Sequence, residues 1–158
     1  MSAQTSYAIN QGKAYAGQIY ALAPHDIVSR KVESATIGFA VAVSRGTDKE
    51  SQVVLGGTSF MGITIRSLDK EGAANTGAIQ WNQKESAGVM RQGYIWAVCP
   101  TGCAAGDPVN YVNATGVLDS GAAVAGETNL TGAKWETTTA AGELGVIRLE
   151  TTATTAGS

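Results

Sequence analysis

The chain has 158 residues, enough for one domain, and 11 basic and 13 acidic residues give it a formal net charge of −2. Charged residues make up only 15% of the chain, against roughly 25% in ordinary domains, and no block of Lys and Arg matches a run of phosphates, so we expect no nucleic-acid partner. Neither a signal peptide nor the roughly 20 apolar residues of a membrane helix is recognisable, so we expect no membrane partner and synthesis in the cytoplasm.

The chain divides into three parts by composition. Residues 1–24 are small and polar with scattered tyrosines, lack a helical period and end at Pro24, so we expect an extended N-terminal arm that pairs with the domain or with a neighbouring molecule. Residues 25–150 are expected to form the folded domain. Residues 151–158 (TTATTAGS) offer nothing to bury and are expected to be a flexible tail.

Several stretches of the domain carry the pattern of β-strands. FMGITIRS (residues 60–67) and GVIRLE (residues 145–150) alternate apolar with polar side chains, which is typical of a half-buried strand. TIGFAVAVS (residues 36–44) and GYIWAV (residues 93–98) are nearly continuous apolar runs, which favours strands covered on both faces. A single helical turn fits near DIVSRKVES or SLDKEG.

Turn signals separate these stretches. The chain has 20 glycines, against about 11 at the average frequency of roughly 7%, and no collagen-like period. Gly56-Gly57, Gly106-Asp107-Pro108 and Asn113-Ala114-Thr115-Gly116 are strong turn sequences. The sequence therefore predicts an all-β fold, a small single-domain β-barrel or β-sandwich with an extended N-terminal arm.

The cysteines are the first candidates for chemistry. Cys99 and Cys103 have C-x3-C spacing, but a zinc site needs four ligands and the chain offers only His25 besides this pair. A thiol nucleophile needs a base and an orienting group, and nothing around His25 supplies them. We expect free thiols with a structural role at a strand end and its turn.

No other pattern points to catalysis. His25 beside Asp26 is typical of a surface turn, and the acidic residues show no spacing that singles out a catalytic pair. We therefore expect a protein that is not an enzyme, with no catalytic, cofactor-binding or metal site and no cofactor.

The tryptophans point instead to binding. Trp96 lies in an apolar run and is expected in the core, whereas Trp81 and Trp135 have polar neighbours. Because Trp and Tyr are over-represented at the energetic centres of interfaces, we take the following as candidate contact residues: Tyr15, Tyr20, Arg45, Trp81 and Trp135.

The order of these stretches resembles a known family. YAGQIYALAPHDIVSR, VAVSRGT, FMGITIRS, RQGYIWAV, AGDPVNYVNATG and GAKWETTTAAGELGVIRL follow one another as in the structural cement proteins of bacteriophages, which are capsid decoration (head cement) proteins. The resemblance covers about residues 16–150. The matching positions are Gly17 and Gln18, residues 43–47, Gly62, residues 93–96, residues 106–109, Gly116, residues 133–135 and Leu149.

The resemblance implies a binding function without catalysis. Proteins of this kind bind the outer surface of the capsid across major capsid protein subunits and stabilise the shell against the pressure of packed DNA. The expected partners are the major capsid protein of the same phage and further copies of this chain, as a homodimer or homotrimer. The expected location is the exterior of the virion, after synthesis in the host cytoplasm, with the arm and the loops near residues 45–50 and 72–88 making the contacts.

Three alternatives stay open at this point. A carbohydrate-binding or adhesion module on the virion would need an exposed aromatic pair on one face. A small hydrolase would use Cys99 or Cys103 with His25. Another virion part, such as a tail or baseplate protein, would also be rich in β-structure and oligomeric.

Overall fold

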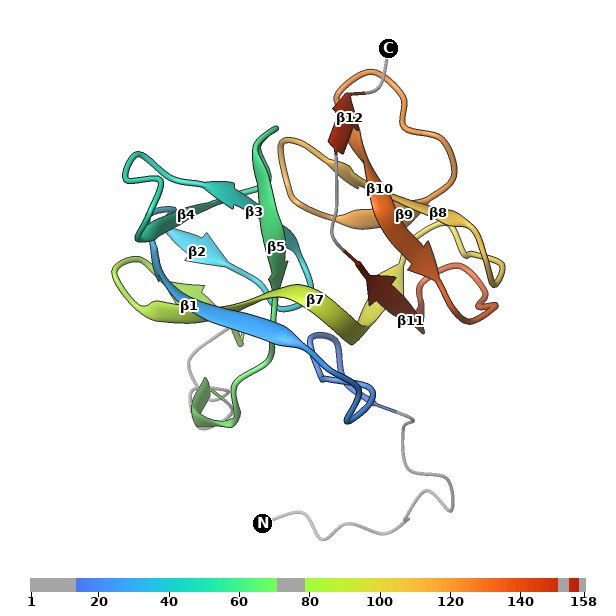
Figure 1. Ribbon diagram of the computed structural model, residues 1–158, viewed down its shortest axis with the longest axis horizontal. Helices are drawn as coiled ribbons and strands as arrows, with labels where there is room; N and C mark the ends of the chain where they lie inside the picture. Colours follow the sequence, from blue (N-terminus) through green and yellow to red (C-terminus); the bar gives the residue numbers. More distant parts are fainter. Residues whose placement is uncertain (1–13, 71–78, 151–153, 157–158) are drawn as a thin grey trace, which may run out of the picture.

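The computed structural model describes residues 14–70, 79–150 and 154–156, and within them the fold is all-β (Figure 1). A short 3₁₀ turn at residues 68–70 lies in the SLDKEG stretch, where a helical turn was predicted. The described helices include none that is long and apolar enough to cross a membrane. The strands are β1 (Asp26–Val32), β2 (Thr36–Ile37), β3 (Ala42–Arg45), β4 (Gln52–Leu55), β5 (Phe60–Thr64), β6 (Trp81–Asn82), β7 (Ser86–Cys99), β8 (Pro108–Val112), β9 (Leu118–Ser120), β10 (Glu127–Trp135), β11 (Glu143–Leu149) and β12 (Thr154–Ala156).

Five strands close into a small barrel, on the left of Figure 1. Strand β1 pairs in parallel with β4 and antiparallel with the first half of β7. The ring continues through antiparallel pairs of β4 with β3, β3 with β5 and β5 with β7. Closure leaves these strands without a free edge, which removes the usual route by which sheets aggregate.

The second half of β7 leaves the barrel and begins a curved C-terminal sheet, on the right of Figure 1. Strand β11 pairs along β7 from Gly93 to Cys99, and the order continues β11, β10, β8, β9. Strand β12 pairs with Thr128–Leu130 of β10. This strand lies within the segment that was expected to be a flexible tail, and residues 151–153 and 157–158 lie outside the described part.

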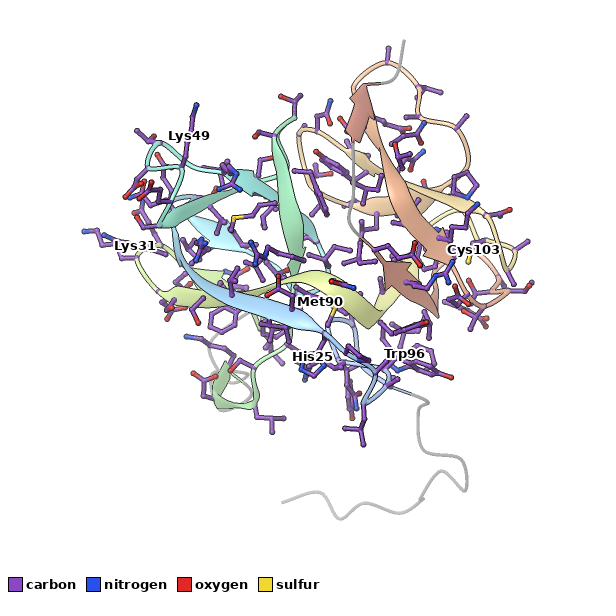
Figure 2. All side chains as sticks on the ribbon, viewed as in Figure 1. His25, Lys31, Lys49, Met90, Trp96 and Cys103 are labelled. Atoms are coloured by element: carbon purple, nitrogen blue, oxygen red, sulfur yellow. The ribbon has the colours of Figure 1, made fainter. Side chains whose placement is uncertain are left out.

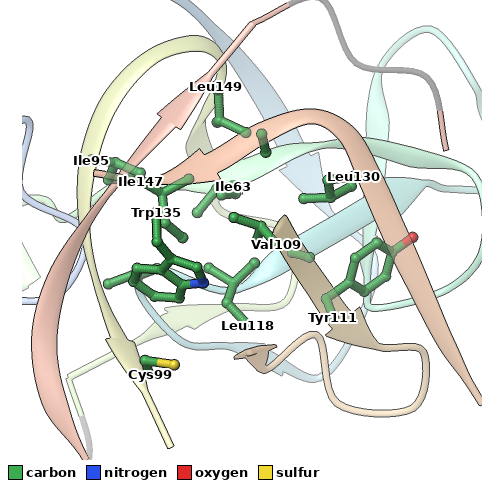
Figure 3. Packing of buried hydrophobic residues seen from close by; sticks show 14 of the residues in the cluster. Ile63, Ile95, Cys99, Val109, Tyr111, Leu118, Leu130, Trp135, Ile147 and Leu149 are labelled. Carbon is green, nitrogen blue, oxygen red and sulfur yellow. The ribbon is translucent and has the colours of Figure 1, made fainter. Parts of the chain in front are cut away.

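The main core lies between the barrel and the C-terminal sheet, and Figure 3 shows it from close by. Trp135 of β10 has 0% exposed surface, and its indole Nε1 donates to the Asp119 carbonyl at 3.2 Å. A Cβ built on Gly145 would lie 3.0 Å from this ring, so the glycine makes room for the indole. A second, smaller core fills the barrel from Val32, Ile37, Val43, Val53, Met61, Trp81, Ala87 and Val89.

The predicted strand patterns are confirmed in part. The alternation in residues 145–150 is confirmed, because Ile147 and Leu149 of β11 are buried and Arg148 is not. The TIGFAVAVS run is not one strand, since it is divided between β2 and β3. The DIVSRKVES stretch forms β1 and no helical turn.

The continuous run in β7 alternates as well. Ile95 and Ala97 are fully buried, while Trp96 is half-buried and Val98 is exposed, so the strand is not covered on both faces. The prediction that Trp96 is a core residue is therefore wrong. Its side chain points to the opposite face because side chains along a strand alternate.

We predict that Trp135→Ala lowers the free energy of unfolding by about 3–5 kcal/mol, because it leaves a cavity in the main core. Trp96→Ala should lower it by about 1–2 kcal/mol, since one side of this indole already faces solvent. Urea unfolding of the two variants and the parent chain measures both values. Equal losses would contradict the assignment of Trp135 to the core and Trp96 to the surface.

Candidate interaction surface

The first described residues, 14–22, lie along β7 and are called the N-terminal segment; they include a turn in which the Gln18 N–H donates to the Tyr15 carbonyl at 3.1 Å. The Gly17 N–H donates to the Trp96 carbonyl at 2.8 Å, and the Trp96 N–H donates to the Gln18 carbonyl at 2.9 Å. The Tyr20 N–H donates to the Tyr94 carbonyl at 3.0 Å. The segment therefore pairs with the domain through one antiparallel β-bridge, between Ile19 and Ile95, on the edge of β7 opposite β11.

Gly17 fixes the segment to the end of the barrel. Its φ of +83° lies in the left-handed region, and a Cβ at this position would come within 2.7 Å of the Arg66 nitrogen. The Arg66 N–H donates to the Gly17 carbonyl at 2.8 Å. The close approach of the two backbones requires a residue without a side chain.

Exposed apolar side chains gather around this segment. Tyr15 and Leu68 line one hollow beside it, and Val98 and Val117 line another together with Ala16. We call six exposed large apolar residues of the described chain the apolar surface: Tyr15, Tyr20, Leu22, Leu68, Val98 and Val117. Val124 is also exposed and does not belong to this group. Single exposed apolar residues are ordinary, whereas a cluster of them is typical of an interaction site.

The larger hollow has a volume of about 480 Å³, and we call it the Tyr15 groove. Tyr15 is 63% exposed and Leu68 is 79% exposed, so both side chains are accessible at the groove. The Arg66 guanidinium carbon lies 4.6 Å from the centre of the Tyr15 ring and 5.6 Å from the Phe39 ring, which are cation–π distances. The other described residues that line it are Gly17, Gln18 and Ile19.

Three aromatic rings lie further along the apolar surface. The Tyr20 ring centre is 6.3 Å from that of Tyr94 and 5.5 Å from that of Trp96. The planes of these pairs are inclined by 46° and 73°. The rings therefore form an edge-to-face cluster and not the flat platform on which sugar rings stack.

Two of the five predicted contact residues lie in this region. Tyr15 and Tyr20 are exposed on the N-terminal segment. Arg45 lies at the end of β3, where its guanidinium donates to the Lys49 carbonyl at 2.8 Å. Figure 2 labels Lys49 and Trp96 on opposite sides of the molecule, so the structure does not bring Arg45 to the apolar surface.

The other two predicted contacts are corrected. Trp81 is 6% exposed and Trp135 is 0% exposed, so neither presents a surface to a partner. The Trp81 Nε1 donates to the Ile65 carbonyl at 3.2 Å, which satisfies its polar atom within the fold. A buried indole with its N–H paired can have polar sequence neighbours, because alternate residues of a strand face solvent.

The sequence analysis did not identify Leu22, Leu68 and Val98 as exposed apolar residues of this surface. Leu68 and Leu22 lie in turns and carry no periodic signal. The alternation in β7 would have revealed Val98 and Trp96, because the buried Ile95, Ala97 and Cys99 fix which face points inward.

The two cysteines are free and buried, as expected for a structural role. Burial raises the pKa of the Cys99 thiol, and its Sγ lies 3.6 Å from a carboxylate oxygen of Asp119. Both effects disfavour the thiolate that a nucleophile needs. His25 lies beside Gly93, because a Cβ built on Gly93 would lie 2.8 Å from the His25 Cβ. Gly93 precedes Cys99 by six residues of β7, which is about 20 Å in an extended strand, so His25 lies far from Cys99.

The described side chains that could bind a metal ion are also far from one another. Within the part of the chain that the structure describes, no three His, Cys, Asp or Glu side chains are placed to hold a metal ion. The His25 Nδ1–H donates to the Ala23 carbonyl at 3.1 Å, and Asp26 pairs with Arg91 at 2.5 Å.

The family model described as "Structural cement protein (E217 gp24/Pam3 gp6)" matches residues 3–150. A chain from the solved structure titled "The capsid of Myoviridae Phage XM1" is similar to this one with a TM-score of 0.74 and 15% sequence identity. The likeness covers 95% of this chain and 98% of that chain and shows a shared fold. No curated protein matches the sequence.

We predict that Gly17→Ala destabilises the protein by about 1–3 kcal/mol, because the new Cβ both strains the backbone and collides with Arg66. Gly106→Ala is the matched control, since it also has a positive φ but no atom lies within 4 Å of its Cβ. Thermal unfolding compares the two variants. A smaller loss for Gly17→Ala than for Gly106→Ala would contradict the close backbone approach.

We also predict that Cys99 resists alkylation in the folded protein. In a Cys103→Ser variant, iodoacetamide at pH 8 should label Cys99 at least ten times more slowly than in guanidinium, because the thiol is inaccessible and its pKa is raised. Mass spectrometry over time gives both rates. Equal rates in the two solvents would show that the thiol is accessible and reactive.

Proposed function

The chain belongs to the structural cement protein family of bacteriophages, and from this we propose that it is a non-enzymatic decoration protein of a phage capsid. It binds the outer surface of the shell across neighbouring major capsid protein subunits and stabilises the shell against the pressure of packed DNA. The family match over residues 3–150 is the observation that carries this proposal.

The described surface suits a protein that works by adhesion. The closed barrel offers a rigid body without free edges between its five strands, and rigid surfaces lose little entropy on binding. The apolar surface around residues 14–22 supplies contact area that is not screened by salt. Attachment to several shell subunits at once makes dissociation slow even where each contact is modest.

We assign the contacts to two separate regions. Tyr15 and Tyr20 face the shell together with the N-terminal arm, of which residues 1–13 lie outside the described part. Arg45 lies in a hairpin that is well fixed, because the Thr47 N–H donates to a Glu33 carboxylate oxygen at 2.7 Å. This hairpin contacts the shell or a sister protomer within a homodimer or homotrimer, and the loop near residues 72–88 lies partly outside the described residues.

The test uses purified shells that lack the protein. Added full-length protein should sediment with expanded shells, should be visible on their exterior by electron microscopy, and should raise the temperature at which DNA-filled particles rupture. Absence from the exterior, or an unchanged rupture temperature at full occupancy, would refute the proposal.

A truncation tests the arm separately. Removal of residues 1–13 leaves the hydrogen bonds of Gly17, Gln18 and Tyr20 to β7 intact. Removal of residues 1–20 would also remove these hydrogen bonds and leave this edge of β7 unpaired. We predict that the shorter deletion lowers shell occupancy by at least tenfold with an unchanged melting temperature. Full occupancy after this deletion would show that residues 1–13 are not needed for binding.

A further inference from the structure

We propose that β12 is a releasable strap over the edge of β10, and that its release lets two copies of this chain pair through that edge. The strap runs antiparallel to β10, with Thr128 opposite Ala156 and Leu130 opposite Thr154. Figure 1 shows it beside β10 in the C-terminal sheet. This role goes beyond the proposed function and does not depend on it.

The edge of β10 keeps its shape when β12 leaves it, because β10 is held from its other side. Strand β8 pairs antiparallel with β10 from Glu127 to Leu130. Thr128 is buried, and its hydroxyl donates to the Asn113 side-chain oxygen at 2.7 Å. Leu130 is buried in the main core. Release of β12 therefore leaves a formed strand with a row of unpaired backbone N–H and C=O groups, which is a template for another strand.

Strand β11 does not cover this part of β10. It pairs with β10 from Ala133 to Trp135, and the Glu150 N–H donates to the Gly132 carbonyl at 3.0 Å. Among the described strands, β12 alone pairs with β10 from Thr128 to Leu130 on the side away from β8. The cover of this edge therefore depends on β12.

The opposite end of the same sheet is protected by other means. Strand β9 has only three residues, Leu118–Ser120. The Ser120 hydroxyl donates to the Gly102 carbonyl at 2.6 Å, which fastens this end to the turn that follows β7. Very short edge strands and covered edges both prevent the addition of a further strand. The edge of β10 is therefore the one that needs a cover.

Strand β12 is held more weakly than the strands around it. Its pairing with β10 covers three residues, Thr154–Ala156, whereas β11 pairs along β7 from Glu143 to Leu149. An element with few backbone pairs opens at a smaller free-energy cost than the sheet on which it lies. While it is in place, a strand of three residues offers little edge of its own for addition. These properties suit a strap that opens while the sheet stays folded.

The uncovered edge fits a second copy of this chain. Because β12 lies antiparallel to β10, this edge already accepts an antiparallel partner. Two β10 edges related by a two-fold axis are also antiparallel, and they can pair with Asn129 of each copy opposite Asn129 of the other. A second β10 and β12 need the same backbone groups, so the two pairings exclude each other.

The experiment uses full-length variants and measures their mass by light scattering over a range of protein concentrations. The double variant Thr154→Pro/Thr155→Pro releases the strap, because adjacent N–H groups of a strand point to opposite sides and one of the two prolines removes a bond to β10. Gly157→Pro is the matched control, since it follows β12 and a residue before proline favours extended backbone. Hydrogen exchange of residues 127–131 locates the contact, and thermal unfolding verifies the fold.

We expect the double variant to reach about twice the mass of the parent chain as its concentration rises, with protection of residues 127–131 that is lost on dilution. The control should match the parent chain throughout. A double variant with the mass of the parent chain at every concentration overturns the inference, as does association that leaves residues 127–131 unprotected. Loss of the folded state in the double variant also overturns it, because β12 would then be a part of the fold and not a strap. None of these outcomes bears on binding to shells, so the proposed function is tested separately.

Discussion

The fold depends on one long strand that belongs to two sheets. Strand β7 closes the barrel with its first half and starts the C-terminal sheet with its second half. The transition falls at Gly93, where φ is +130° and a Cβ would lie 2.8 Å from the Cβ of His25. Because both cores pack against the same strand, the barrel and the sheet hold a fixed relative position, and the N-terminal segment that lies along β7 shares that rigidity.

Much of the architecture was predictable from local sequence patterns. The all-β class follows from short apolar stretches and frequent glycine turns, and the positive φ values at Gly56, Gly106 and Gly116 confirm turn positions read from the sequence. The sequence did not decide between a β-barrel and a β-sandwich. The barrel closes through the parallel pairing of β1 with β4, which joins residues about 20 positions apart and leaves no local signal in the sequence. The division of residues 36–44 into two strands needs the left-handed turn at Ala40, which sequence patterns do not reveal.

The contact residues were harder to predict than the fold. Polar neighbours made Trp81 and Trp135 look exposed, and an apolar run made Trp96 look buried, yet Trp81 and Trp135 are buried and Trp96 is half-buried. For Trp81 and Trp135 the buried face of the strand was fixed by tertiary packing, whereas the alternation along β7 would have placed Trp96 on the face opposite Ile95 and Ala97. Tyr15 and Tyr20, chosen because Tyr is over-represented at interfaces, are exposed in the structure, and their role as contacts stays a prediction.

The low charge of the chain and the grouping of its exposed apolar side chains favour attachment by shape and hydrocarbon contact. The described N-terminal segment and strand β12 lie at opposite ends of the view in Figure 1. A partner that covers the apolar surface around residues 14–22 would therefore leave β12 on the far side of the molecule, uncovered by that contact.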